Sequence, residues 1–158
     1  MHDLTPQSGR FDGPRHQFAV RVYFEDTDLS GVVYHANYLR WFERARSDML
    51  RLLGIDQRGA HDAGEGAYAV ADLSIRYLRP AKLDDAVLIV SETTEVTAAT
   101  CRIRQTAWRG LDKLAEAQVR AAFVAPNGRP RRQKREWVEA FNTVLIPATP
   151  GPSTESPA

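Results

Sequence analysis

The amino-acid sequence predicts an α+β domain in which an antiparallel sheet of about five strands wraps around one long helix. Three observations support this fold class. Five segments alternate apolar and polar residues with the period of two that half-buried strands show. One segment instead repeats its apolar residues at steps of three and four, as a helix does. No segment of helical length separates the later strand candidates, so parallel crossovers are not expected there.

Composition divides the chain into three parts. Residues 1–16 mix Gly, Pro, Ser and charged residues without a period, so we expect a flexible N-terminal arm. Residues 17–143 carry the periodic segments and form the single domain that a chain of 158 residues allows. Residues 144–158 are rich in proline, so we expect a disordered tail there.

The first predicted strand is QFAVRVYF at residues 17–24, whose apolar residues share one face from Phe18 to Phe24. The other strand candidates are residues 68–78, 85–96, 100–108 and 113–124, and short turn-rich segments between the last three favour antiparallel hairpins. The residues predicted to face the core are Ala69, Ala71, Leu73, Ile75 and Tyr77 in the first of these four strands and Ala115, Ala117, Val119, Ala121 and Phe123 in the last.

The long helix is predicted to begin near Ala36 and to end before Gly54, which stands where a capping glycine belongs. Its apolar stripe consists of Tyr38, Phe42, Ala45, Met49, Leu52 and Leu53. The sheet offers the available surface to cover that stripe. A short helix is expected near residues 56–63. Trp137 and Phe141, four residues apart, predict another near the C-terminus.

Composition also narrows the function classes. The net charge of +1 does not favour nucleic acid as the main partner. No apolar run reaches the roughly 20 residues of a membrane span, and the N-terminal residues lack the apolar core of a secretory signal. The single cysteine, Cys101, fits a cytoplasmic protein and is expected in the core or an interface. One cysteine and four histidines do not predict a metal site, and no cofactor is expected.

The most informative stretch is EDTDLSGVVYHANYLRWFERAR at residues 25–46, because it places acids and a histidine just before a helix. Gly31 allows unusual backbone angles or the close approach of a ligand. No Ser, Thr or Asp stands immediately before Ala36, so the free N–H groups of the helix start are available to a ligand oxygen. A carbonyl oxygen that becomes negative in a transition state would suit these donors.

Two acids of this stretch are candidate catalytic groups. Asp26 and Asp28 lie on opposite sides of an extended chain, so only one is expected to reach a bound carbonyl. It could attack that carbonyl or activate a water molecule. His35 stands beside the proposed donors, where it could orient a group or move a proton. On the residues alone, the alternative stays open that the acids are turn residues and His35 merely starts the helix.

The run VRVYFEDTD…GVVYHANYLRWFERARSDML resembles the signature of hotdog-fold acyl-CoA thioesterases. More narrowly, it is similar to the 4-hydroxybenzoyl-CoA thioesterase family and its YbgC-type branch, which is associated with the bacterial Tol-Pal envelope system. The specific match covers residues 20–54, and a looser match continues to about residue 132. The resemblance implies a hotdog fold. It also implies hydrolysis of an acyl-CoA or acyl carrier protein thioester to a free acid and a thiol, in a homodimer or homotetramer. Coenzyme A is then part of the substrate.

The resemblance also implies roles for individual residues. Asp28, three residues before the glycine, would be the catalytic carboxylate, either as nucleophile or as general base. The backbone N–H of His35 would polarise the thioester carbonyl, with the imidazole in a supporting role. The substrate-binding stretch would comprise Phe24, Gly31, Val32, Val33 and Tyr34. Relatives of this branch often carry a tyrosine at the position of Phe24, so this chain lacks a hydroxyl there.

Basic residues are candidates for contacts with the phosphates of coenzyme A. Arg102 and Arg104 alternate along a predicted strand and could share a face, and arginine suits phosphate. A solvent-facing strand edge is the alternative. The run RPRRQKR at residues 129–135 could meet phosphates, an acidic partner or nucleic acid, but a solvated segment is the simpler interpretation. A hotdog hydratase or dehydratase and a non-catalytic binding module remain alternative functions. The acyl group is not predicted.

Overall fold

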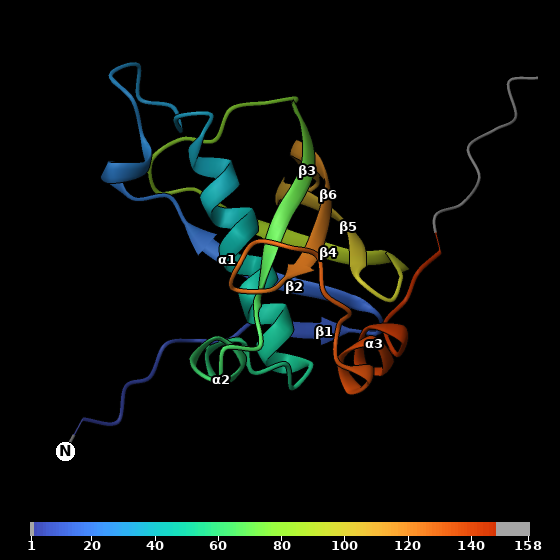
Figure 1. The fold of residues 1–158 in the computed structure, drawn as a ribbon. Coiled ribbons are helices and arrows are strands. Elements are labelled where there is room, and N and C mark those ends of the chain that lie inside the picture. The colour runs from blue at the N-terminus through green and yellow to red at the C-terminus, as the bar shows by residue number, and fades with distance from the viewer. Residues whose placement is uncertain (1, 148–158) are drawn as a thin grey trace, which may run out of the picture.

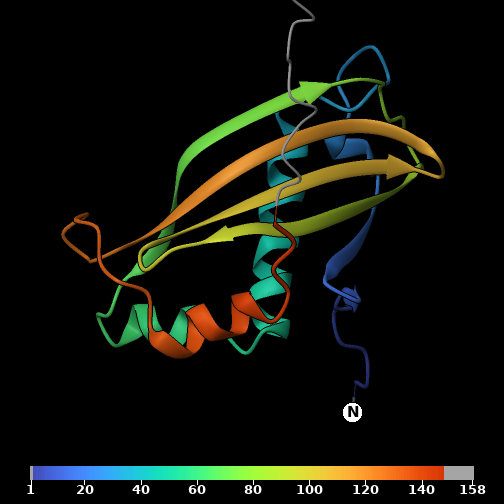
Figure 2. The ribbon, with the colours of Figure 1, turned by 90° about the vertical axis from the view of Figure 1, so that its right-hand side faces the viewer.

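The computed structural model describes residues 2–147, and a six-stranded sheet curves around its longest helix, α1 (Figures 1 and 2). The strands lie in the order β1-β2-β4-β5-β6-β3, and all neighbours are antiparallel. The strands are β1 Arg10–Asp12, β2 Arg15–Arg21, β3 Ala67–Tyr77, β4 Ala86–Val96, β5 Thr100–Arg109 and β6 Asp112–Val124. The helices are η1 Phe24–Asp26 (3-10), α1 Asn37–Leu52, α2 Gln57–Asp62 and α3 Arg135–Asn142. The predicted α+β class is confirmed.

The path of the chain determines which strands lie at the two edges of the sheet. After β2 the chain runs through α1 and α2 and returns at the far side of the sheet as β3, which pairs with β6. Strands β4, β5 and β6, the last three in the chain, follow one another through short turns, as predicted. Within the described chain, β3 pairs with β6 alone, so its outer edge is open. No helix among residues 2–147 has both the length and the apolar character needed to cross a membrane.

The core lies between α1 and the concave face of the sheet, in two clusters. The first half of α1 packs on the middle of the sheet, and Phe42 is fully buried there beside Ile89 and Val119. The second half of α1 packs with α3, through Met49 and Phe141. The stripe predicted for α1 is largely correct. Leu52 is instead exposed, and Trp41 and Leu50 are buried.

A bulge in β3 changes which residues face the core. Leu73 and Ile75 pack against the core as predicted. The pairing register with β6 shifts between Val70 and Asp72, so Ala69 and Ala71 are exposed, contrary to the prediction. Tyr68 packs against the core instead, because a slip of one residue moves every side chain before it to the opposite face.

The N-terminal segment is more ordered than the sequence indicated. Strand β1 lies within the predicted flexible arm, and β2 begins at Arg15, ahead of residue 17. The side chain of His16 is fully buried, where its Nε2 lies 2.7 Å from Asp48 Oδ2 of α1. Strand β2 also ends at Arg21 rather than at Phe24. The contact of His16 with Asp48 accounts for the order of the N-terminal segment, and a contact over 32 residues leaves no local pattern in the sequence.

The short helices and the C-terminal end complete the fold. Helices α2 and α3 lie at the end of the sheet nearest the C-terminus of α1 (Figure 1). Residues 144–147 run along β4 instead of leaving the domain, because the N–H of Ile146 donates to Thr93 O at 2.8 Å and Val144 is buried. The rest of the predicted disordered tail, residues 148–158, lies outside the described residues.

Candidate active site

The loop between β2 and α1 folds back on itself before the helix starts. An antiparallel bridge joins Thr27 to Val33, and the N–H of Asp28 donates to Val32 O at 2.9 Å. Gly31 has a φ of +85°, which side-chain-bearing residues rarely adopt, and a Cβ there would meet nothing within 4 Å. The glycine is therefore required by the backbone turn and not by crowding.

The structure gives Asp26 and Asp28 different surroundings. The carboxylate of Asp26 accepts hydrogen bonds from the N–H of Tyr23 at 2.8 Å and from the amide of Asn37. Asp26 therefore ties the loop to the first residue of α1. The carboxylate of Asp28 is exposed, and its Oδ1 accepts hydrogen bonds from the hydroxyl and the N–H of Ser30. Its Oδ2 accepts none from the described residues and is free to meet a substrate.

The contacts of Ser30 also fix the charge of Asp28. The hydrogen bonds from the hydroxyl and then the backbone N–H of Ser30 hold the pKa of Asp28 below its ordinary value of 3.8. Hydrogen bonds to the charged form stabilise that form, so Asp28 is a carboxylate at neutral pH. Neither nucleophilic attack nor general-base chemistry requires a further base to deprotonate it.

The start of α1 presents two unused backbone donors. The N–H of Asn37 donates to Tyr34 O at 2.8 Å and closes a turn, and Ala36 has φ −67° and ψ −18°. Within residues 2–147, the N–H groups of His35 and Ala36 meet no acceptor, and no side chain caps the helix. The helix dipole adds partial positive charge at this end. Two free donors at a helix start suit a carbonyl oxygen that gains negative charge.

Two clefts flank this helix start. One, of about 260 Å³, is lined by Asp28, Tyr34, Ala36 and Arg40 among others. The other, of about 290 Å³, is lined by the side chains of His35, Val33 and Tyr77 with their neighbours. Asp28 therefore shares a cleft with Ala36 and Asn37 at the helix start, and His35 lines the neighbouring cleft. No hydrogen bond joins the side chains of Asp28 and His35 within the described chain.

Tyr77 was predicted to face the core, but it is 43% exposed and contacts the helix start instead. Its hydroxyl donates to the carbonyl oxygen of His35 at 2.8 Å, and its ring stands edge-on to the imidazole with centroids 6.0 Å apart. The bonded carbonyl belongs to the same peptide group as the free N–H of Ala36. Hydrogen bonds at the two ends of a peptide group strengthen each other, so this contact improves the donor. Tyr77 lies 42 residues from His35, and no local pattern marks the contact.

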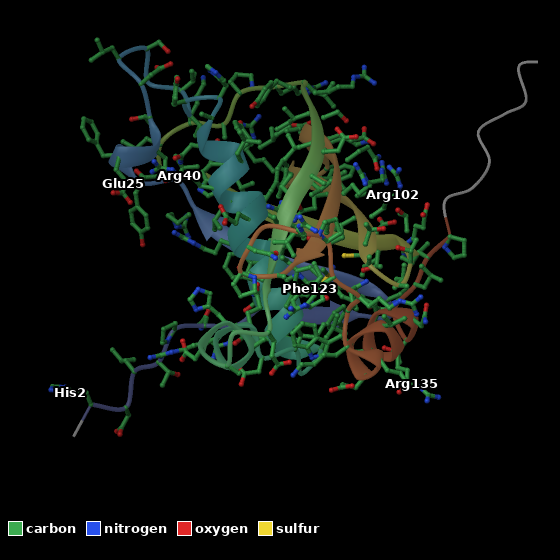
Figure 3. The ribbon with its side chains drawn as sticks, in the orientation of Figure 1. His2, Glu25, Arg40, Arg102, Phe123 and Arg135 are labelled. Atoms are coloured by element: carbon green, nitrogen blue, oxygen red, sulfur yellow. The ribbon has the colours of Figure 1, made fainter. Side chains whose placement is uncertain are left out.

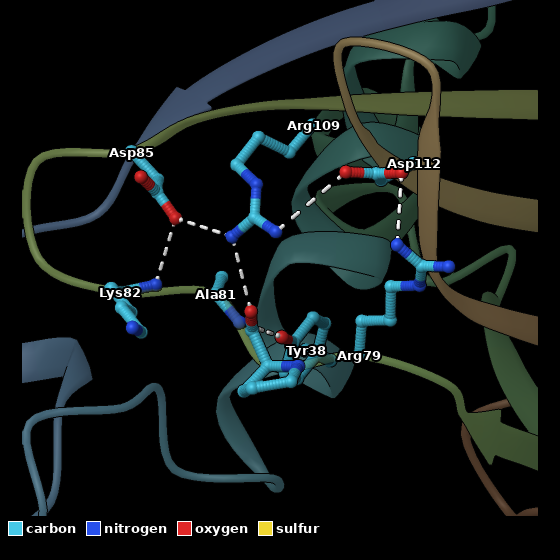
Figure 4. Close-up of polar contacts among 8 residues, drawn as sticks. Tyr38, Arg79, Ala81, Lys82, Asp85, Arg109 and Asp112 are labelled. Carbon is cyan, nitrogen blue, oxygen red and sulfur yellow. Dashed lines mark hydrogen bonds and ion pairs between the residues drawn. The ribbon is translucent and has the colours of Figure 1, made fainter.

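A polar network fixes the loop between β3 and β4, which lines the His35 cleft through Leu78, Arg79 and Pro80 (Figure 4). Arg109 donates to Asp85 Oδ2 at 2.9 Å and to Pro80 O at 3.1 Å. The N–H of Ala81 donates to the hydroxyl of Tyr38 on α1 at 3.1 Å, and Val33 donates to Ala81 O at 2.8 Å. The loop is thus bonded to the sheet, to the helix and to the stretch before the helix. It positions the His35 cleft.

The other predicted substrate-binding residues fall into different places. Val33 is buried and lines the His35 cleft, whereas Val32 is half-buried and forms a bridge with Lys82. Tyr34 lines the Asp28 cleft and is about half exposed, at 51%. Phe24 is 81% exposed in η1 and lines neither cleft. Arg40 was not predicted and lines the Asp28 cleft.

Arg102 and Arg104 lie far from these clefts. They stand on the outer face of β5, whose inward residues Cys101 and Ile103 are buried. Figure 3 shows Arg102 on the opposite side of the molecule from Arg40. Both strand arginines pair with acids of the same sheet: Arg102 with Glu95 at 3.4 Å, and Arg104 with Glu116 at 2.8 Å. A role in binding coenzyme A stays a prediction.

Two further expectations concern the basic run and the cysteine. The run at residues 129–135 is not a solvated segment throughout, because Gln133 is buried and Lys134 pairs with Glu65 at 2.7 Å. Cys101 is 1% exposed, and burial raises the pKa of its thiol to about 12. Cys101 was predicted to lie in the core or an interface, and it belongs to the core. A thiol with a raised pKa is a poor nucleophile.

Comparisons with known proteins agree on one family. A model of the thioesterase superfamily matches residues 30–116. The acyl-CoA thioesterase YbgC of Haemophilus influenzae is 45% identical over 107 residues, which cover 68% of this chain and 79% of the relative. The acyl-CoA thioester hydrolase YbgC of Escherichia coli is 37% identical over 127 residues, which cover 79% and 94%. A solved probable thioesterase from Bartonella henselae, 36% identical, matches with a TM-score of 0.71 over 76% of this chain and 99% of its own.

Proposed function

Because the chain belongs to the thioesterase superfamily and is a thioester hydrolase, we propose that it cleaves acyl-CoA at the start of α1 with Asp28 as the reacting carboxylate. One observation carries this proposal. Asp28 lines the same cleft as a helix start whose N–H groups at His35 and Ala36 have no acceptor within the described residues. A thioester carbonyl that accepts from these donors would present its carbon to the free Oδ2 of Asp28.

The chemistry then follows one of two routes. As a nucleophile, Asp28 would form a mixed anhydride with the acyl group and release the thiolate, and water would then hydrolyse the anhydride. As a general base, Asp28 would take a proton from a water molecule as that water attacks the same carbon. In both routes the carbonyl oxygen becomes negative, and the two backbone donors stabilise it.

His35 contributes in two ways on this account. Its backbone N–H is one of the two oxyanion donors. Its imidazole occupies the neighbouring cleft beside Tyr77, without a bond to Asp28, so a supporting role in protonating the departing thiolate fits its position better than a role in holding Asp28.

We also propose that the chain forms a homodimer, because Asp28 is open to solvent and the outer edge of β3 is unpaired within the described chain. Pairing two β3 edges about a twofold axis would bury that edge. Tyr77 lies on this strand, so such a dimer would form beside the catalytic turn. We extend the proposal to a tetramer and to a cytoplasmic location. An acyl carrier protein thioester as substrate and a link to the Tol-Pal system stay predictions from the resemblance.

A panel of acyl-CoA thioesters with a thiol-detecting reagent tests the proposed function. The proposal expects release of free coenzyme A from at least one saturated acyl-CoA. Binding without thiol release from any member would instead support a binding module. Hydration of crotonyl-CoA without thiol release would support a hydratase. A single turnover in ¹⁸O-labelled water separates the two hydrolytic routes, because label in the carboxylate of Asp28 arises from the anhydride route alone.

A further inference from the structure

A third cavity lies under the middle of α1, away from the catalytic turn. It has a volume of about 290 Å³ and opens between α1 and strands β3, β5 and β6. Its inner wall is apolar, with Leu50, Cys101, Ile103, Ala121 and Phe141. Arg46 lines it from α1. Arg46 is ten residues beyond Ala36, about 15 Å along the helix axis, so this cavity is separate from the Asp28 cleft.

Arg46 is anchored in this cavity by a neutral partner. One guanidinium nitrogen donates to Gln105 Oε1 at 2.8 Å. Gln105 is fully buried, and its amide nitrogen donates to Phe42 O and to Ser91 Oγ, both at 2.9 Å. These bonds fix the orientation of the Gln105 side chain, and through it the position of the guanidinium. The remaining N–H donors of Arg46 have no acceptor within the described residues.

The charge of Arg46 is only partly compensated, by the nearby carboxylate of Glu43. None of the ion pairs between described residues includes it. Glu43, one turn earlier on α1, also lines the cavity but is exposed and forms no pair with it. Burial lowers the pKa of the Arg46 guanidinium, which shows that the charged form is poorly solvated there. A half-buried charge that is only partly compensated is unfavourable, and an anion in the cavity would relieve that cost.

From these contacts we propose that the cavity binds a monocarboxylic acid, with the carboxylate on Arg46 and an apolar body against the inner wall. The planar fork of arginine matches a carboxylate, and the wall suits a short aliphatic or aromatic group. The free acid released by thioester hydrolysis belongs to this class, and that identification rests on the proposed function. The presence of the site does not rest on the proposed function. If the chain hydrolyses acyl-CoA, the cavity would bind the acid product at a distance from Asp28.

Thermal unfolding and calorimetric titration of the Asp28→Asn protein test the site without turnover. Hexanoate, octanoate and benzoate are compared with hexanamide, octanamide and benzamide, which keep the shape and lack the charge. The proposal expects a saturable rise in Tm with the acids and none with the amides. Arg46→Gln should weaken acid binding about tenfold or more, because a hydrogen bond to a charged group is lost.

Matched variants separate the cavity from general charge effects. Arg44→Gln removes the same charge from an exposed position of α1 outside this cavity and should leave acid binding unchanged. Glu43→Gln should tighten binding, because it removes the acid at the cavity. If Arg46→Gln does not fold, NOEs between benzoate ring protons and the Ile103 methyls in the parent protein decide the question. Equal binding of acids and amides, equal losses in both arginine variants, or NOEs elsewhere would overturn the proposal. Thioesterase activity without acid binding at Arg46 would overturn this proposal alone. Acid binding without thioesterase activity would overturn the proposed function alone.

Discussion

The hydroxyl of Tyr77 donates a hydrogen bond of 2.8 Å to the carbonyl oxygen of His35, so the edge strand β3 holds the turn that starts α1. Tyr77→Phe removes this bond and leaves the ring in place. We expect kcat to fall about threefold to tenfold, the change that a lost hydrogen bond of about 1 kcal/mol produces, with KM little changed. Tyr23→Phe is the control, because no described residue bonds its hydroxyl. Equal kcat in the two variants would show that the contact does not support catalysis.

The backbone donor of His35 can be tested separately from its imidazole. His35 is the second residue of the turn from Tyr34 to Asn37, a position where proline is favoured. His35→Ala removes the imidazole, and His35→Pro removes the imidazole and the N–H. The proline variant should be slower than the alanine variant by about 10²–10³-fold in kcat. Equal rates in two folded variants, with folding checked by circular dichroism, would remove this N–H from the mechanism.

The serine beside Asp28 sets the pH at which activity is lost in acid. Ser30→Ala removes the hydroxyl bond that contributes most to the lowered pKa of Asp28. The carboxylate then becomes harder to ionise, so the acid limb of the kcat/KM profile should move to higher pH, with little change at neutral pH. Thr27→Val removes another hydroxyl of the same loop, which donates to Phe24 O. Its acid limb should stay in place, and a shared shift would argue against a specific effect of Ser30.

The burial of His16 beside Asp48 makes the stability of the fold depend on pH. Burial lowers the pKa of His16 below its ordinary value of 6.5, and the Asp48 carboxylate offsets part of that shift. The unfolded chain therefore binds a proton more readily than the folded one. The contribution of His16 is complete above about pH 6.5 and is lost as the pH falls towards its folded pKa. Urea unfolding should show a smaller loss on acidification for His16→Gln than for the parent.

The control for this pH effect is the exposed His61, whose pair with Asp62 lies at the surface. His61→Gln should keep the full loss of stability between about pH 7.5 and about pH 5, because it leaves the buried His16 in place. If His16→Gln and His61→Gln lose the same stability over this range, the burial of His16 is not the source of the pH dependence.

The elements predicted correctly are those whose formation depends on residues close together in the sequence. The strands at 85–96, 100–108 and 113–124 lie within one or two residues of β4, β5 and β6, because alternation and short turns specify antiparallel hairpins. Helix α1 and its glycine at residue 54 follow from periodicity and capping. The bulge in β3 was not predicted, since a register shift depends on the partner strand β6.

The site was predicted in its residue types and less well in its contacts. Asp28 and the free N–H of His35 lie at one helix start. The resemblance had already selected Asp28, and the structure adds that Asp26 is bonded within the loop. The catalytic role of Asp28 stays a prediction. Tyr77 contacts His35 across 42 residues of sequence, and Arg109 contacts Asp85 across 24. Contacts between residues so far apart cannot be predicted from local spacing. His16 was assigned to a flexible arm for the same reason.

In the proposed mechanism, the carboxylate of Asp28 reacts with a thioester bound at the start of α1. Steady-state hydrolysis of the best acyl-CoA by Asp28→Asn tests it most directly, beside Glu25→Gln, which alters another acid of the same cleft. The account predicts that kcat/KM of the Asp28 variant falls by about 10²–10⁴-fold at unchanged Tm, and that the Glu25 variant stays close to the parent. Similar activity in both variants would contradict it.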